Sequence, residues 1–214
     1  MKKPPQYESN VFINCPFDPQ YKPFLEAIAF AVLDYGFRIR CASESDDNME
    51  VRLEKIKRII GECRLGIHDV SRVRTTKNGG KQYPRFNMPY ELGLFMGCRQ
   101  WGSPQDRRKQ ALILDANREQ TRFTSSDLAG LDPHYHNNDY RKAVEEVCAW
   151  LSPFSNSSKI LPGATAVLER YDLFRQDFLP LCVRLQRTEE EIKFGDYTRI
   201  VDEWLYDYYH PPTP

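Results

Sequence analysis

Glu91 is the acidic residue whose sequence setting best suits catalysis. It lies in the segment from Arg85 to Gly93 (RFNMPYELG), where Pro89 predicts a helix start because a first turn does not need its missing N–H group. A glutamate in that first turn would be held ionised by the helix dipole and the free backbone N–H groups. A fixed carboxylate suits a nucleophile, or a stabiliser of positive charge, at a ribosyl carbon. The alternative is that Glu91 only complements the helix dipole.

A second acidic residue, Asp69, lies near the end of the apolar segment LGIHDV (65–70). It could accept hydrogen bonds from ribose hydroxyls, or it could cap a turn. His68 precedes it and points to the opposite side of an extended chain. We therefore expect His68 to be structural and Asp69 to belong to the candidate site.

The residues after the first apolar segment form a third candidate group. Asn14 could hydrogen-bond a ligand, and Phe17 could stack on a base. Pro16 ends the segment, and Asp18 is suited to cap the following helix. Cys15 is a weak candidate nucleophile because no histidine lies near it in the sequence.

Other polar residues give weaker signals. Arg72 could meet a phosphate or pyrophosphate, although a solvated basic loop is the plainer interpretation. His134 and His136 are spaced like two metal ligands, but no third ligand is evident, so we expect a polar loop without a metal. The sequence lacks the P-loop, GxGxxG and GxSxG motifs of nucleoside triphosphatases, Rossmann proteins and serine hydrolases. We therefore predict no cofactor.

The elements that must position these residues follow an alternating pattern. Short apolar segments predict strands, and longer segments with apolar residues at helical spacing predict helices. Ser45 or Asp46 is suited to cap the second helix, and 71–87 is expected to be a polar loop. The expected strands are 11–15, 37–42, 65–70 and 110–115, and the expected helices are 21–35, 49–60, 89–100 and 139–151.

This alternation predicts an α/β fold: a doubly wound, mostly parallel sheet of four or five strands with helices on both faces. Ligands of such sheets bind at the carboxyl ends of the strands, where Asn14 and Asp69 lie. We expect this domain over 1–151, a Ser- and Pro-rich linker over 152–163 and a C-terminal helical hairpin over 164–214. The hairpin cannot bury its apolar faces alone, so it should pack on the domain, on a second subunit or on both.

Composition narrows the class of function. The chain has 30 basic and 30 acidic residues, a net charge of +0 that gives no strong signal for nucleic-acid binding. No apolar segment reaches the roughly 18 residues of a membrane span, and the first residues do not resemble a signal peptide. The six cysteines lie mostly in apolar segments, which is typical of free thiols in a reducing compartment. We therefore expect a cytoplasmic protein with no membrane partner.

The motifs VFINCPFD, ECRLGIHDVSR, MPYELGLFMG and KQALILD follow one another in this order. Their order and spacing resemble the superfamily of Toll/interleukin-1 receptor (TIR)-like proteins and nucleoside 2-deoxyribosyltransferases, over residues 10–116. The resemblance implies cleavage of an N-glycosidic bond in NAD⁺, another nucleotide or a deoxynucleoside. It makes Glu91 the catalytic carboxylate and gives Asp69 the task of orienting the sugar or base. Asn14 and Phe17 would line the base side.

One departure from the transferase pattern narrows the range of substrates that we expect. The transferases usually carry Asp and a Gly-Thr-like pair before the catalytic Glu, where this chain has RFNM (85–88). This difference favours a phosphate-bearing ligand near Arg85 over deoxyribosyl transfer. The resemblance thus implies an N-glycosidase acting on NAD⁺ or another nucleotide, with a place in bacterial anti-phage defence.

A non-catalytic module of the same fold, which binds a nucleotide signal or acts by assembly, is the alternative. We expect the C-terminal helices to form a homo-oligomer or to bind a partner protein. The predicted catalytic residues are Glu91 and Asp69, and the predicted nucleotide-binding residues are Asn14, Pro16, Phe17, Asp18, Arg72, Arg85 and Asn87.

Overall fold

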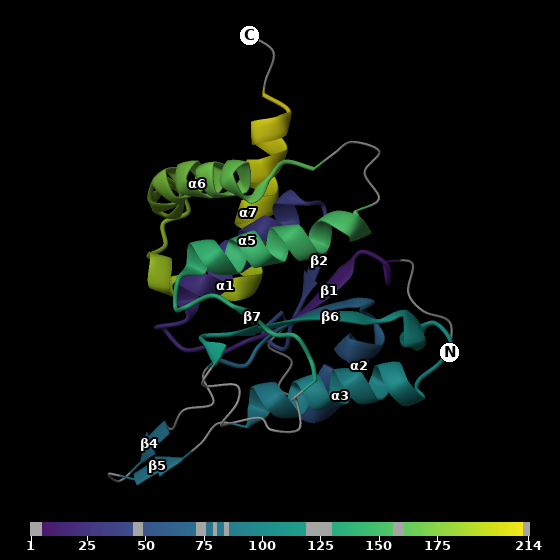
Figure 1. Cartoon of the computed structure of the whole chain (residues 1–214). Helices are drawn as coiled ribbons and strands as arrows, with labels where there is room; N and C mark the ends of the chain where they lie inside the picture. Colours follow the sequence, from purple (N-terminus) through teal and green to yellow (C-terminus); the bar gives the residue numbers. More distant parts are fainter. Residues whose placement is uncertain are drawn as a thin grey trace.

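A five-stranded parallel sheet forms the centre of the structure (Figure 1). The computed structural model describes residues 6–44, 49–71, 76–78, 81–83, 86–118, 130–155 and 161–211. The strand order is β2-β1-β3-β6-β7, and every neighbouring pair is parallel. The predicted α/β class with a doubly wound sheet is therefore confirmed. The strands are β1 (Asn10–Asn14), β2 (Arg38–Arg40), β3 (Leu65–Asp69), β6 (Gln110–Asp115) and β7 (His134–Tyr135).

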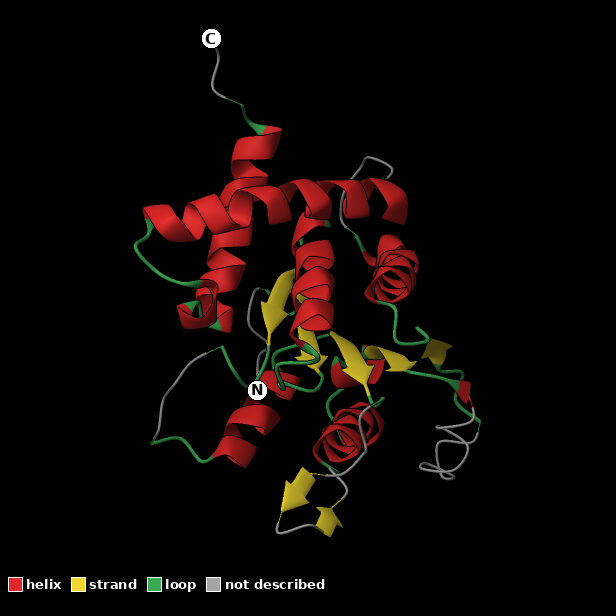
Figure 2. Cartoon of the chain, turned by 90° about the vertical axis from the view of Figure 1, so that its left-hand side faces the viewer, coloured by secondary structure: helices red, strands yellow, loops and turns green. Residues whose placement is uncertain are grey.

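Helices cover both faces of the sheet (Figures 1 and 2). One face carries α2 (Arg52–Gly61) and α3 (Asn87–Trp101), and the other carries α1 (Lys22–Asp34) and α5 (Tyr140–Leu151). No helix in the described ranges is long and apolar enough to cross a bilayer. A further layer over α1 and α5 consists of α6 (Ala164–Arg184) and α7 (Phe194–Tyr209). The short 3₁₀ helices are η1 (Asp106–Arg108), η3 (Ser152–Phe154) and η4 (Glu189–Glu191).

The two central strands show why the sequence forms this sheet. Every residue of β1 and of β3 is buried, as expected for parallel strands covered on both faces. Leu65 and Ile67 face the core under α1 and α5, while Gly66 and His68 face α3. A Cβ atom at Gly66 would lie 2.7 Å from His68 Nε2, so only glycine fits there without a shift.

The C-terminal helices α6 and α7 complete the larger core of the molecule. Phe174 lies at their crossing, with ring centroids 5.5 Å from Phe30 and 5.6 Å from Trp204. The guanidinium group of Arg170 forms an ion pair of 2.6 Å with Asp34 at the end of α1. The helices therefore pack on the α/β core, which is one of the expected positions. They cross steeply in both views instead of forming the expected hairpin (Figures 1 and 2).

Three local elements differ from the prediction. The expected polar loop contains an antiparallel pair, β4 (Thr76–Asn78) and β5 (Lys81–Tyr83), whose polar sequence lacks an apolar alternation. The strand β7 has two residues, too few for any periodic pattern. Finally, α2 begins only at Arg52 with no side-chain cap, and Met49, expected on its apolar face, is 95% exposed. Ser45 and Asp46 lie outside the described residues.

Candidate functional site

The carboxyl ends of β1 and β3 meet at the topological switch point of the sheet. The chain leaves β1 through α1 to reach β2, and it leaves β3 through α3 to reach β6 on the opposite side. Ligands of doubly wound sheets bind in the crevice that this reversal creates. Asn14 pairs in register with His68, so Asp69 extends one residue further at the same edge. The fold thus brings Asn14 and Asp69 to neighbouring positions.

Asn14 faces the α3 side of the sheet. Its Nδ2 lies 3.0 Å from His68 Nδ1 and donates a hydrogen bond of 2.8 Å to the carbonyl oxygen of Met88. Since Nδ1 of His68 accepts, its ring proton lies on Nε2, on the side of the Phe95 ring. Burial lowers the pKa of His68 to about 3, so the ring is neutral. His68 is therefore a structural histidine, as predicted, and Asn14 keeps only its Oδ1 for a ligand.

Glu91 lies in the second turn of α3, and the prediction of a first-turn position is wrong. The helix begins at Asn87, two residues before Pro89, because the third helical position also tolerates a missing N–H group. The Glu91 residue is 7% exposed. Burial raises the pKa of its carboxyl group, and the positive charge of Arg52 opposes this only in part. The environment of Glu91 therefore favours the protonated form, whereas the sequence predicted the ionised form.

Asp69 faces the α1 side and is fully enclosed. The hydroxyl of Tyr21 donates to Oδ2 at 2.5 Å, and the backbone N–H of Ser71 donates to Oδ1 at 2.8 Å. His136 is buried, and its Nε2 lies 3.2 Å from Oδ2, within ion-pair distance but at an angle too poor for a hydrogen bond. The N–H of Asn138 donates to His136 Nδ1, so the ring proton lies on the nitrogen that faces Asp69.

This arrangement changes the roles expected for two residues. Asp69 has no exposed surface and both of its oxygens have partners, so a ligand could reach it only by displacing one of them. We expected His136 in a polar loop without a metal, and it instead lies next to Asp69 in the core. The sequence spacing does not predict this contact. His136 directly follows β7, and only the formation of the sheet brings the ends of β3 and β7 to the same side of the molecule. His134, by contrast, pairs with Glu146 near the surface.

The loop between β1 and α1 carries the predicted base-binding residues. Pro16 is buried, while Phe17 is 40% exposed and available for stacking. Asp18 Oδ1 accepts from the backbone N–H of Tyr21 at 3.0 Å, so it caps the turn that leads into α1. Burial, with Asp69 and other acidic groups nearby, raises the pKa of the Cys15 thiol, which makes it a poor nucleophile.

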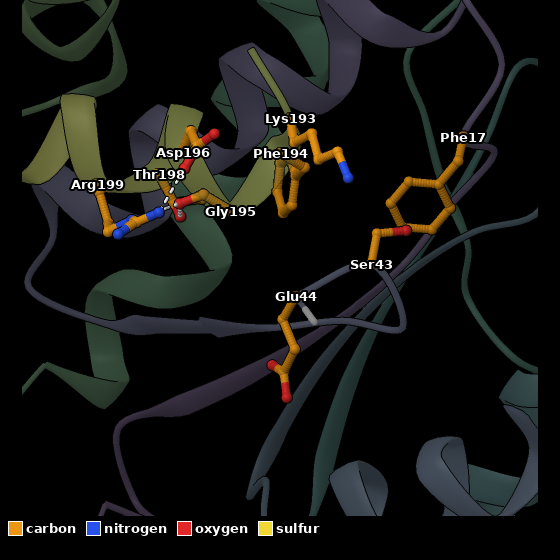
Figure 3. Close-up of a pocket in the computed structure, with 9 residues that line it drawn as sticks. All are labelled: Phe17, Ser43, Glu44, Lys193, Phe194, Gly195, Asp196, Thr198 and Arg199. Atoms are coloured by element: carbon orange, nitrogen blue, oxygen red, sulfur yellow. Dashed lines mark hydrogen bonds and ion pairs between the residues drawn. The ribbon is translucent and has the colours of Figure 1, made fainter. Parts of the chain in front are cut away.

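A cavity of about 680 Å³ opens between this loop, the end of β2 and the start of α7 (Figure 3). Phe17 lines it, and on α7 the edge-to-face partner Phe194 lines it too. A second cavity of about 350 Å³ also uses both rings. Neither cavity is lined by Glu91 or Asp69. Sequence patterns do not predict α7 at this position, because its place depends on how the C-terminal helices cross the core.

The remaining predicted residues divide into two groups. Asn87 is the exposed first residue of α3, at the same edge of the sheet as Asn14. Arg72 and Arg85 lie outside the described residues. Among the side chains that the structure describes, no three His, Cys, Asp or Glu residues form a group able to hold a metal ion. Comparisons of the chain with family models, curated proteins and solved structures found no match.

Proposed function

We propose that the protein is an N-glycosidase that cleaves NAD⁺ or another nucleotide, with Glu91 as its catalytic carboxyl group. The observation that carries the proposal is the environment of Glu91. It is a nearly buried acid beside the switch point, and among the described residues it has no hydrogen-bond partner. Because burial raises the pKa of Glu91, keeping its carboxyl group ionised in this position costs stability, and acids with such perturbed pKa values cluster at functional sites.

The raised pKa of Glu91 suits both halves of a hydrolysis. In its protonated form the carboxyl group can give its proton to a departing base as the bond between C1′ and the ring nitrogen breaks. In its ionised form it can stabilise the positive charge that develops on the ribose, and a water molecule then forms the new bond to C1′ and gives up its proton to this carboxylate. Nicotinamide leaves NAD⁺ as a neutral molecule and needs no proton.

The neighbouring residues fit supporting roles in this reaction. Asn14 holds the carbonyl of Met88, which lies about one turn before Glu91, and so fixes the start of α3. Asp69 is enclosed, so we assign it to positioning the loop between β1 and α1 and not to a direct contact. Phe17 is exposed enough to stack on a base.

The test is chromatographic analysis of products after incubation with NAD⁺ and a panel of nucleotides. We expect nicotinamide or a free base from the wild type and from the control Glu54→Gln, an exposed carboxyl on α2. The Glu91→Gln variant should lose about 100-fold or more of this activity. Equal rates for wild type and Glu91→Gln would reject the role of Glu91. Circular dichroism of both variants controls for folding.

The enclosure of Asp69 favours a second candidate, a module that binds a nucleotide signal without cleaving it. Here no product would form with any ligand, but a bound nucleotide would raise the melting temperature. As part of the same proposal, the C-terminal helices would support a homo-oligomer or a partner protein. The six free cysteines support a reducing compartment such as the cytoplasm. A place in anti-phage defence is supported by the family resemblance alone.

A further inference from the structure

We infer that a third cavity, between α6 and α7, binds a small organic cation with an apolar body, such as an arylalkyl amine. Its volume of about 430 Å³ lies in the range of small-molecule sites, roughly 300–1,000 Å³. The residues that line it belong to 177–185, at the end of α6, and to 200–207 of α7. Neither Glu91 nor Phe17 is among them, so the proposed glycosidase activity can fail without affecting this site.

Both helices give this cavity an apolar surface. The apolar residues that line it are Pro180, Leu181, Leu185, Ile200 and Trp204. Leu185 directly follows the last residue of α6 and is 52% exposed. A ligand that covers this surface removes it from water, which favours binding. An ion without an apolar body would not gain this contribution.

The indole ring of Trp204 is held in place at the cavity. Its ring centroid lies 5.6 Å from that of Phe174, edge to face, and 5.2 Å from that of Tyr208, which stacks on it. Its Nε1 donates a hydrogen bond of 2.8 Å to Asp177 Oδ2, which fixes a carboxylate of α6 beside the aromatic ring of α7. In the described part of the molecule Asp177 Oδ1 has no partner, so it can accept from a ligand. A carboxylate beside an aromatic ring suits a ligand whose cationic group and apolar body are close together.

The charged groups that line the cavity favour a cation. The three carboxylates of Asp177, Glu203 and Asp207 are opposed by the one guanidinium group of Arg184, so the net charge of the lining is −2. Glu203 and Asp207 lie one turn apart on α7, a spacing at which like charges repel. Neither forms a hydrogen bond or an ion pair with another residue that the structure describes. A bound cation would reduce their repulsion.

The end of α6 contributes to the same preference. This helix ends at Arg184, so the negative end of its macrodipole lies at the cavity. Within the described ranges, no three acidic, His or Cys side chains form a group able to hold a metal ion, so the carboxylates of the lining do not favour a bare metal ion. Their charge and the apolar lining together favour an organic cation. Arg184 opposes such a ligand, because its guanidinium group has the same charge.

The test titrates phenylbutylamine, a cation at neutral pH, into the isotopically labelled full chain and follows the indole N–H signals by nuclear magnetic resonance. The chain has three tryptophans, and Trp101 and Trp150 do not line the cavity, so their signals are internal controls. We expect the Trp204 signal to shift with a dissociation constant of about 1 mM or lower. Neutral phenylbutanol and anionic phenylbutyrate, which share the apolar body, should bind at least about tenfold more weakly. Trp101→Phe and Trp150→Phe identify the two control signals.

Substitutions of the lining charges should change the affinity for phenylbutylamine in opposite directions. The double variant Glu203→Gln/Asp207→Asn should weaken binding about tenfold, because it removes two of the three carboxylates. Arg184→Met should strengthen binding about threefold, because it removes the opposing guanidinium group. Glu54→Gln and Lys57→Met, on α2, are the matched controls and should leave binding unchanged. Circular dichroism of every variant controls for folding.

Four results would each overturn the assignment of this site. They are no shift of the Trp204 signal up to about 10 mM amine, equal shifts of the control signals, equal affinity for the amine and the alcohol, and full affinity in the double variant. Asp207→Asn alone replaces the double variant if that variant does not fold, with an expected loss of about threefold. Phenylbutylamine has no N-glycosidic bond, and Glu91→Gln should bind it as the wild type does. Failure here and failure of the glycosidase proposal are therefore separate results.

Discussion

The hydroxyl group of Tyr21 donates a hydrogen bond of 2.5 Å to the carboxylate of Asp69. Both residues are buried, and the bond joins the residue before α1 to the last residue of β3. At its other end, the same loop is held to α3 by Asn14 through the carbonyl of Met88. The loop that carries Phe17 is therefore fixed at both ends across the switch point.

Removing this hydroxyl should destabilise the fold. In Tyr21→Phe the Asp69 carboxylate loses its short hydrogen bond while the ring keeps its packing, so we expect a loss of about 1.5–3 kcal/mol in the free energy of unfolding. Urea denaturation measures it. Tyr206→Phe, on a ring that is 65% exposed, is the control and should change stability by less than about 0.5 kcal/mol. Equal stability of the two variants would show that the bond contributes nothing.

Glu91→Gln should stabilise the protein in a pH-dependent way. Burial raises the pKa of Glu91 in the folded state, so the folded protein binds the proton more tightly than the unfolded chain. Stability is then highest at acid pH, below the unfolded pKa, and falls as the pH rises through the folded pKa. The glutamine variant escapes this loss, and we expect a gain of about 0.5–2 kcal/mol at pH near 8.

The gain in the free energy of unfolding of Glu91→Gln should shrink toward pH 4, near the carboxyl pKa of an unfolded chain. Denaturation at both pH values measures it, with Glu54→Gln as the exposed control. A gain that is the same at both pH values would mean that ionisation of Glu91 is not its cause.

Lys109 is a buried cation that stabilises the opposite edge of the sheet. Its ammonium group donates to the carbonyl oxygens of Ile60, at 2.7 Å, and of Cys63, at the end of α2, and lies 3.5 Å from Asp106. The substitution Lys109→Met would remove the ammonium group that offsets the charge of the buried Asp106. We therefore expect a loss of about 3–5 kcal/mol in the free energy of unfolding. Thermal and urea unfolding measure this loss. The surface change Lys57→Met should have little effect, and a comparable loss there would point to a general effect of removing charge.

Two glycines should respond in opposite directions to alanine. At Gly66 the added methyl group would lie 2.7 Å from His68 Nε2 and 3.0 Å from the Phe95 ring, so Gly66→Ala should cost about 1–3 kcal/mol. At Gly93, within α3, the methyl group meets nothing within 4 Å. Gly93→Ala should therefore gain about 0.5–1 kcal/mol through helix propensity. Chemical denaturation of both variants checks the pair, and a loss at Gly93 would contradict the open space described there.

The sequence predicts those parts of the fold that local patterns determine. The strands β1, β3 and β6 are continuous apolar segments, and α5 shows a clear apolar stripe, so the alternating order was readable. The sequence does not predict the exact start of α3, because a proline is tolerated at several positions of a first turn. That shift of two residues reversed the protonation expected for Glu91.

The surroundings of the candidate site depend on contacts that sequence spacing does not encode. Asp69 and His136 meet only because β7 joins the sheet edge, and β7 is too short to give a pattern. Likewise, Phe17 was predicted as a stacking residue, but its partner Phe194 comes from a helix beyond the expected linker. Local sequence patterns therefore predict the ends of β1 and β3 but not the residues that cover them.

Phe30 packs against both C-terminal helices, α6 and α7, and so links them to the α/β core. Phe30 is fully buried on α1, and its ring lies 5.4 Å from Tyr171, 5.5 Å from Phe174 and 6.0 Å from Trp204. A fragment that stops at residue 151 would leave this ring and its apolar neighbours in water. The C-terminal helices thus cover apolar surface of α1, and we expect a fragment that lacks them to expose this surface and to aggregate.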